Sequence, residues 1–186
     1  HIMQWDSPWG RSYPGWHIEC SAMGRKFLGE HFDIHTGGID HIPIHHENEI
    51  AQSEACNGVE FSKYWLHNAF LNINNQKMSK SLGNFFTVRE IGEKYDLQIL
   101  RFFMLSAHYR SPLNFSADLM ESSKNGLERI VTSAERLKNL AEKAEGTLKE
   151  EEKKLLEGQK EFVAKFEAAM EDDFNTADAI SAIFEF

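Results

Sequence analysis

The stretch Lys-Met-Ser-Lys-Ser at residues 77–81 places two lysines beside two serines, and Gly83 closes it. Flexible ammonium groups next to small hydroxyls suit the binding of phosphate oxygens that gain charge as a bond breaks. Taken alone, these residues fit a solvated basic turn equally well. A glycine pair and a candidate metal site upstream favour a phosphate-binding loop.

A second group of residues suits a metal ion. His45 and Glu49 are four residues apart in a segment with helical spacing, so both side chains can point towards one place. Cys20 lies in another predicted element and can supply a thiolate, and a sulfur, imidazole and carboxylate set suits zinc. A surface His–Glu pair and a small core cysteine are the more common roles of such residues. The polar residues 46–48 leave the choice of ligands open.

Composition limits the function classes. The chain has 186 residues, of which 41% are hydrophobic, enough for one packed domain with an appendage. Its formal net charge of -9 argues against coating nucleic acid by bulk electrostatics, although a local basic patch for RNA remains compatible with it. Cys20 and Cys56 do not make a disulfide framework, which predicts a reducing, cytoplasmic setting. No apolar run has the length of a membrane span, so we expect no membrane partner.

Short apolar runs alternate with glycine-marked turns up to about residue 86. The patterns predict a helix, a short buried strand stopped by Gly37 and Gly38, a second helix and a second strand, at residues 15–28, 32–35, 44–57 and 64–73. Strands separated by helices predict an α/β fold with a partial Rossmann-like parallel sheet. Ligands of such sheets lie beyond the carboxyl ends of the strands, so the glycine pair and residues 77–81 would face one crevice.

The pattern becomes helical after residue 86. Thr87 and Glu90 have the spacing of a capping box, an apolar helix follows at 97–107, and Ser116 begins a long helix that ends near residue 144. We predict three parts and interpret the ends as cloning remnants. The parts are half of a nucleotide-binding catalytic domain at 4–86, a stem-contact-like helical connection at 87–116 and a truncated helical bundle at 117–186, with remnants at 1–3 and 185–186.

Residues 5–116 resemble the catalytic region of cysteinyl-tRNA synthetase, a class I aminoacyl-tRNA synthetase. The matching segments follow one another in the order of the family. They are residues 14–23, 32–35, 45–53 and 77–87. The stretch Asp-Asp-Phe-Asn-Thr at 172–176 is also similar to the family.

The resemblance implies that Cys20, His45 and Glu49 bind one Zn²⁺ per subunit, and that residues 77–81 are the class I signature loop. It implies catalytic roles for Lys77 and Lys80 in that loop. It also implies an ATP site, with Mg²⁺ accompanying the nucleotide, and an amino-acid pocket. The ATP contacts would be Lys80, Ser79, Ser81, Gly37, Gly38 and Asp40, and the pocket would be lined by Trp16 and His35.

The sequence also departs from the family. Thr36 stands where the family usually has the first of three glycines, and Pro43-Ile44 stands where it usually has Phe-Pro. The family carries, near its N-terminus, a further zinc-ligating cysteine and a His-Ile-Gly-His signature, which this sequence does not contain. Cys56 is not that ligand. We therefore expect a fragment that lacks the N-terminal half of the catalytic domain.

The function implied for the parent protein is ATP-dependent ligation of L-cysteine to tRNA(Cys) through cysteinyl-adenylate, with zinc selecting the thiol. Two alternatives stay open: the cysteine:amino-sugar ligase of mycothiol biosynthesis, and a non-catalytic zinc- or RNA-binding module derived from a synthetase. We expect a monomeric parent. The fragment itself should be inactive, should bind zinc weakly or not at all, and should tend to self-associate through an unpaired strand edge.

Overall fold

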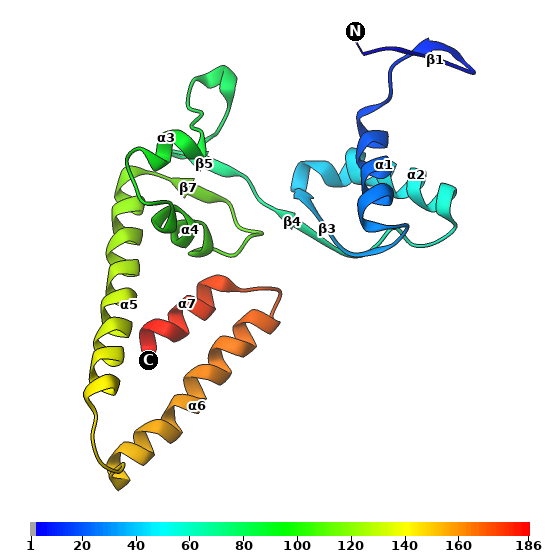
Figure 1. Cartoon of the computed structure of the whole chain (residues 1–186). Coiled ribbons are helices and arrows are strands. Elements are labelled where there is room, and N and C mark those ends of the chain that lie inside the picture. Colours follow the sequence, from blue (N-terminus) through cyan, green and yellow to red (C-terminus); the bar gives the residue numbers. More distant parts are fainter. Residues whose placement is uncertain (1–2) are drawn as a thin grey trace. The chain divides into compact units, whose positions relative to one another are not determined.

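The computed structural model describes residues 3–186, which form two compact units that divide between Ala69 and Phe70 (Figure 1). Each unit is described by itself. The predicted domain boundary at residue 86 falls inside the second unit, and the three-part division stays a prediction. None of the described helices is long and apolar enough to cross a membrane.

The first unit holds two helices that pack on each other and a pair of parallel strands (Figure 1). Its elements are the hairpin of β1 (Trp5–Ser7) and β2 (Gly10–Ser12), then α1 (Trp16–Leu28), β3 (Phe32–Gly38), η1 (Ile39–His41), η2 (Ile42–His46), α2 (Glu47–Asn57) and β4 (Ser62–Asn68). The predicted helical stop after α2 is confirmed, because Gly58 ends the helix in the left-handed conformation with φ of 71°. Phe61 is almost fully buried and meets Phe32 edge to face, with ring centroids 4.8 Å apart.

Two of the strand predictions were partly wrong. β3 does not stop before the glycines: it continues through Gly37 and Gly38, which pair with His67 and Asn68 of β4. Its side chains are half-buried or exposed, because the described residues give β3 a partner strand on one edge only. The strand predicted at residues 64–73 is two strands, which separate at residues 69–70. The predicted parallel pairing of the strands at either side of α2 is confirmed.

The second unit combines a small sheet with a set of helices (Figure 1). Its strand order is β6-β5-β7, in which β5 and β7 run parallel and β5 and β6 antiparallel. The elements are β5 (Leu71–Ile73), β6 (Gln76–Lys77), η3 (Lys80–Leu82), α3 (Val88–Gly92), α4 (Leu97–Leu105), β7 (Leu113–Phe115), α5 (Ala117–Lys143), α6 (Glu150–Glu171) and α7 (Thr176–Glu185). α4 packs on α5 around the buried Phe103 and Met120, and α6 packs on α7. The mixed α/β class with small parallel sheets and a helical region agrees with the prediction.

Helix ends in the second unit follow the predicted signals. The Thr87 hydroxyl accepts from the Glu90 backbone, while the Glu90 carboxylate accepts from the Thr87 backbone, which completes the capping box. The Ser116 hydroxyl accepts from the Leu119 backbone at the start of α5. Residues 172–175 form the turn between α6 and α7, where Asp173 has a positive φ of 55°, and Thr176 begins α7.

Candidate functional site

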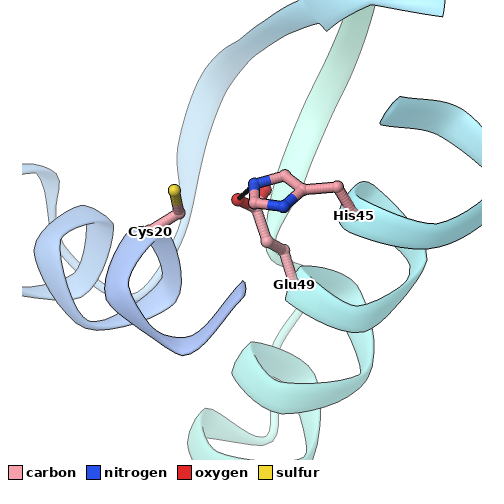
Figure 2. Close-up of side chains that lie close together, drawn as sticks. All are labelled: Cys20, His45 and Glu49. Atoms are coloured by element: carbon pink, nitrogen blue, oxygen red, sulfur yellow. Dashed lines mark ion pairs between the residues drawn. The ribbon is translucent and has the colours of Figure 1, made fainter. Parts of the chain in front are cut away.

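Three elements of the first unit bring the predicted metal ligands together. Cys20 comes from α1, His45 from η2 and Glu49 from the first turn of α2. One donor atom from each lies within 4.8 Å of the others, and Figure 2 shows the sulfur, the imidazole and the carboxylate meeting. His45 and Glu49 are buried and Cys20 is half-buried. The spacing argument for His45 and Glu49 therefore holds across the junction between η2 and α2.

Glu49 is the centre of this arrangement. Its side chain is fully buried, and its two oxygens face different histidines: Oε1 is 2.7 Å from His45 Nε2, and Oε2 is 2.6 Å from His35 Nε2. Burial alone would favour the neutral acid. The hydrogen bond and charge of His35, with contributions from Cys20 and His45, outweigh burial and hold the pKa of Glu49 below its ordinary value of 4.5. The carboxylate is therefore ionised at neutral pH.

The thiol is held in its protonated form. Burial raises the pKa of Cys20 above 9.0, and the neighbouring Glu49 carboxylate raises that pKa further. A cation bound here would replace the thiol proton, because the thiolate is the form that binds metals. Metal binding should accordingly release a proton.

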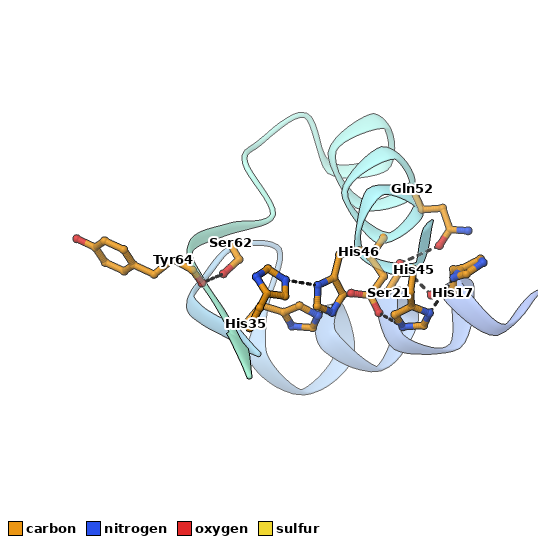
Figure 3. A network of polar contacts seen from close by, with 10 residues as sticks. His17, Ser21, His35, His45, His46, Gln52, Ser62 and Tyr64 are labelled. Atoms are coloured by element: carbon orange, nitrogen blue, oxygen red, sulfur yellow. Dashed lines mark hydrogen bonds and ion pairs between the residues drawn. The ribbon is translucent and has the colours of Figure 1, made fainter. Parts of the chain in front are cut away.

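Two more histidines lie beside the candidate ligands. His17, on α1, lies with its Nδ1 2.8 Å from Nδ1 of His45, so the two rings fix each other's orientation (Figure 3). His46 is only 3% exposed, and its Nδ1 lies 2.8 Å from Nε2 of His67 on β4. Burial, followed by the charge of His35, lowers the pKa of His46 to about 4. The contact of His17 with His45 resembles those of the outer partners that orient metal-binding imidazoles.

The glycine pair of β3 makes room for this histidine cluster. A Cβ on Gly37 would lie 2.6 Å from Cε1 and 2.7 Å from Nε2 of His46, closer than side chains tolerate. A Cβ on Gly38 would lie 2.5 Å from Asp40 Oδ1, the end of an exposed and flexible side chain. Position 37 thus requires glycine, because the buried His46 ring lies where a larger residue would place its Cβ.

The donor set fits a thiophilic cation. Glu49 Oε1 is close to His45 Nε2, but that contact lacks hydrogen-bond geometry, and Oε1 is one of three buried side-chain oxygens without a hydrogen bond among residues 3–186. An ionised oxygen without a hydrogen bond in a buried site is costly. A divalent ion bound by Cys20, His45 and Glu49 would satisfy it, and sulfur, nitrogen and oxygen donors together are a typical zinc set.

Trp16 and His35, the predicted amino-acid contacts, both border this cluster. Trp16 begins α1 and stacks obliquely on His45, with ring centroids 4.2 Å apart, while 58% of its surface remains exposed. His35 lies on β3 between Phe61 and Trp65, with centroid distances of 5.5 and 4.8 Å. Both side chains are therefore close to the candidate metal ligands, and the exposed indole is free to contact a small molecule.

The predicted signature loop lies in the second unit. A two-residue turn at Asn74 and Asn75, both with positive φ, joins β5 to β6. The side chain of Asn114 on β7 accepts from the Asn75 backbone at 2.6 Å and so fixes this turn to the sheet. Lys77 ends β6, and η3 begins at Lys80. The loop thus starts from β6, a two-residue strand that the sequence did not predict, while the predicted strand ends at Ile73 in β5.

Asn84 and the two serines shape the loop. Asn84 accepts from the Ser79 backbone at 2.8 Å and donates to the Lys77 carbonyl at 3.2 Å, and the hydroxyls of Ser79 and Ser81 lie 2.7 Å apart. Both lysines are exposed. Lys77 Nζ lies 4.0 Å from the Phe70 ring centroid and Lys80 Nζ lies 5.3 Å from that of Phe85, and neither ammonium forms an ion pair within residues 3–186. Their charges remain available for an anion.

The sequence analysis missed several residues of the site. His17 could have been found, since it precedes Cys20 by three positions on one helix and shares its face. His67 and Asn84 carry no such signal, because their contacts depend on strand register and on the path of a loop. His46 was recognised only as a competitor for the role of His45.

The comparisons with known proteins agree with these features. Residues 2–125 match the family described as tRNA synthetases class I (C) catalytic domain, and residues 165–186 match the DALR domain. The cysteine–tRNA ligase of Lachnospira eligens (strain ATCC 27750) is 65% identical over 97% of this chain and 39% of its own length. That of Clostridioides difficile (strain 630) is 58% identical, with the same coverage of 97% and 39%. The chain thus spans about two fifths of the relatives it matches.

Solved structures with a similar fold are also synthetases. The Agrobacterium radiobacter K84 agnB2 LeuRS, solved in a ternary complex with tRNA and LeuAMS, superposes with a TM-score of 0.70 and 15% identity over 98% of this chain and 29% of its own. Mycobacterium tuberculosis methionyl-tRNA synthetase, in complex with methionyl-adenylate, gives a TM-score of 0.63 and 19% identity over 82% of this chain and 32% of its own. At these identities the likeness concerns the fold alone. Because the family match covers residues 2–125, the chain belongs to the tRNA synthetases of class I (C) and carries part of their catalytic domain.

Proposed function

We propose that this chain is the part of a cysteine–tRNA ligase that selects the amino acid and binds the phosphates of ATP. The whole ligase would join L-cysteine to tRNA(Cys) through cysteinyl-adenylate. The observation that carries the proposal is the convergence of Cys20, His45 and Glu49, with a buried Glu49 oxygen left without a hydrogen bond. The cysteine–tRNA ligases at 58–65% identity support the choice of amino acid.

Cys20, His45 and Glu49 would hold Zn²⁺ in this site. When bound, the zinc supplies a thiophilic Lewis acid that favours a thiol ligand over the hydroxyl of serine. His17 contacts Nδ1 of His45, which leaves Nε2, the nitrogen that faces Glu49 Oε1, for the zinc. Trp16 lies over that ring and can cover a small side chain bound beside it. Selection through one specific polar contact can reject a close analogue by about 10⁴–10⁵-fold.

Lys77 and Lys80 would neutralise the pyrophosphate that leaves when the cysteine carboxylate attacks the α-phosphate of ATP. Ser79 and Ser81 would donate hydroxyl hydrogen bonds to the same phosphates, and Mg²⁺ would accompany the nucleotide. Catalysis of this kind depends mainly on positioning and electrostatics, because ATP brings its own leaving group. The left-handed Gly83, with φ of 68°, allows the loop to change direction behind η3.

Gly37, Gly38 and Asp40 would lie along the nucleotide near its ribose. Gly37 and Gly38 end β3 and Asp40 lies just beyond in η1, so all three are at the carboxyl end of the strand, the usual place of ligands in sheets of this type. Asp40 is exposed and lies in the three-residue η1, which has no side-chain cap. Its carboxylate would therefore be available for ribose hydroxyls. The chain alone would lack adenylation activity.

The test is a hybrid ligase in which this chain replaces the matching segment of the Lachnospira eligens enzyme. The hybrid should support ATP–pyrophosphate exchange that depends on cysteine and not on serine, and its Cys20→Ser variant should lose that preference. The isolated chain should give no exchange. A hybrid that folds but activates serine as well as cysteine, or exchange by the isolated chain, would refute the proposal. The hybrid should attach cysteine to tRNA and not to an amino sugar. This result would distinguish the proposed function from that of the mycothiol-pathway ligase.

A further inference from the structure

A groove lies between α1 and α2, which pack on each other in the first unit (Figure 1). Its volume is about 580 Å³, within the usual range of sites for small molecules. Ile18 and Ala22 contribute apolar surface to it, and Cys56 contributes a thiol. None of the three candidate metal ligands lines the groove, so it is separate from the site described above.

Two buried oxygens without a hydrogen bond belong to residues of this groove. Within residues 3–186, Glu49 Oε1 shares that property with Ser53 Oγ and Asn57 Oδ1, and both Ser53 and Asn57 line the groove. Ser53 is only 4% exposed, so bulk water does not satisfy its hydroxyl. The N–H groups of a bound molecule would supply the missing hydrogen bonds.

Two cations at the groove favour a molecule with negative charge. Lys26 Nζ lies 5.3 Å from the Phe27 ring centroid and forms no ion pair within residues 3–186. Arg25 binds Glu30 through Nη2 at 3.1 Å, while its Nη1 donates to Cys56 Sγ at 3.3 Å. Because the whole chain carries a net charge of -9, any attraction of an anion to this groove must come from these two residues.

Cys56 gives the groove a reactive group. Its side chain is exposed, and the guanidinium of Arg25 lies where an attacking thiolate would carry its negative charge. We propose that the groove binds small, acidic, peptide-like disulfides and that Cys56 forms a mixed disulfide with them. Carboxylates of the ligand would face Lys26 and Arg25, its N–H groups would face Ser53 and Asn57, and one sulfur would meet Cys56.

The exchange needs no oxidant besides the bound disulfide. The Cys56 thiolate attacks one sulfur of the ligand, so that a new S–S bond forms to Cys56 and the original S–S bond breaks. Cys56 is oxidised, and the departing sulfur is reduced and takes up the proton that the thiol gave up. This inference does not rest on the proposed activity, because it concerns only a modification of the chain.

The test compares two probes of opposite charge, glutathione disulfide and cystamine. The folded chain reacts with each probe, and mass spectrometry of its peptides follows the rate at Cys56; the same chain in urea gives the intrinsic ratio of the two rates. We expect the ratio of glutathione disulfide to cystamine to be about tenfold higher in the folded chain, from the ionic contact and the hydrogen bonds of the groove. The net charge of the chain acts in the opposite direction.

Variants identify the residues responsible. Lys26→Gln should lower the ratio about 2–5-fold, whereas Lys63→Gln, an exposed lysine on β4 outside the groove, should leave it unchanged. Ser53→Ala should slow the reaction with glutathione disulfide about 2–10-fold. Lys26 is exposed, so Lys26→Gln decides the question if Ser53→Ala does not fold.

Three results would overturn the inference. They are an equal ratio in the folded chain and in urea, equal ratios for Lys26→Gln and Lys63→Gln, and an unchanged rate in a folded Ser53→Ala variant.

Discussion

Gly37→Ala should destabilise the first unit and disturb the histidine cluster, although alanine suits the local backbone. Neither Gly37 nor Gly38 has a positive φ, so a methyl group at either position meets no backbone strain. At Gly37 the added Cβ would lie 2.6 Å from Cε1 of His46 and 2.9 Å from Nδ1 of His41. The His46 ring is 3% exposed and lies against Trp65 and His67, so it has little room to move.

The cost follows from these contacts. Overpacking of a buried site costs about 1–3 kcal/mol. Displacing His46 from His67, now at 2.8 Å, forfeits a further ~1 kcal/mol for the hydrogen bond. We therefore expect a loss of about 2–4 kcal/mol in the free energy of unfolding, or about 1–2 M in the urea midpoint at a typical slope for a small domain.

Gly38→Ala is the matched control. Its Cβ would meet only the Asp40 carboxylate, which is exposed and can rotate away, so its effect should stay within about 1 kcal/mol of zero. Urea unfolding of both variants, followed by tryptophan fluorescence, measures the difference. Equal midpoints for Gly37→Ala and Gly38→Ala would show that His46 does not occupy the described position.

Three further results are expected. His17→Ala removes the outer partner of His45 and should weaken zinc binding about 10–100-fold by competition with a chelator, whereas unchanged affinity would contradict that role. Lys80→Ala in the Lachnospira hybrid should slow pyrophosphate exchange about 10²–10³-fold, with the neighbouring Leu82→Ala as control; equal rates would contradict the phosphate role. The hydrogen bond from Tyr109, with a further contribution from Arg110, outweighs burial and holds the pKa of Asp173 below 3.8. The ionised Asp173 therefore stabilises the fold above pH 3.8, and this stabilisation is lost as the pH falls through the lowered pKa. Tyr109→Phe should therefore lower the thermal midpoint at pH 7 and lose this effect in acid; a pH-independent difference would contradict the assignment.

Local signals predicted much of the fold. The left-handed Gly58, the capping box at Thr87 and the N-cap Ser116 act within one turn of their helices, so the sequence reveals them directly. The strands were harder to predict. The apolar run at 64–73 gave no sign that the chain would change partner strands near Ala69, because that change depends on pairing with β3 and β7.

The candidate site was predictable only in part. His45 and Glu49 share a helical face, and the resemblance to the synthetases placed Cys20 beside them. The contact of His46 with His67 depends on the parallel register of β3 and β4, which no short-range pattern encodes. The role of Gly37 is likewise set by a ring that approaches from another element, so its sequence position suggested a turn where the structure has a strand.

Zinc X-ray absorption on the chain loaded with one equivalent of zinc tests the central claim most directly. The spectrum should require one sulfur at about 2.3 Å with nitrogen and oxygen donors at about 2.0–2.2 Å, and the sulfur contribution should vanish in Cys20→Ser and persist in Cys56→Ser. A first shell made only of nitrogen and oxygen, or a sulfur contribution that survives Cys20→Ser, would contradict zinc binding by Cys20, His45 and Glu49.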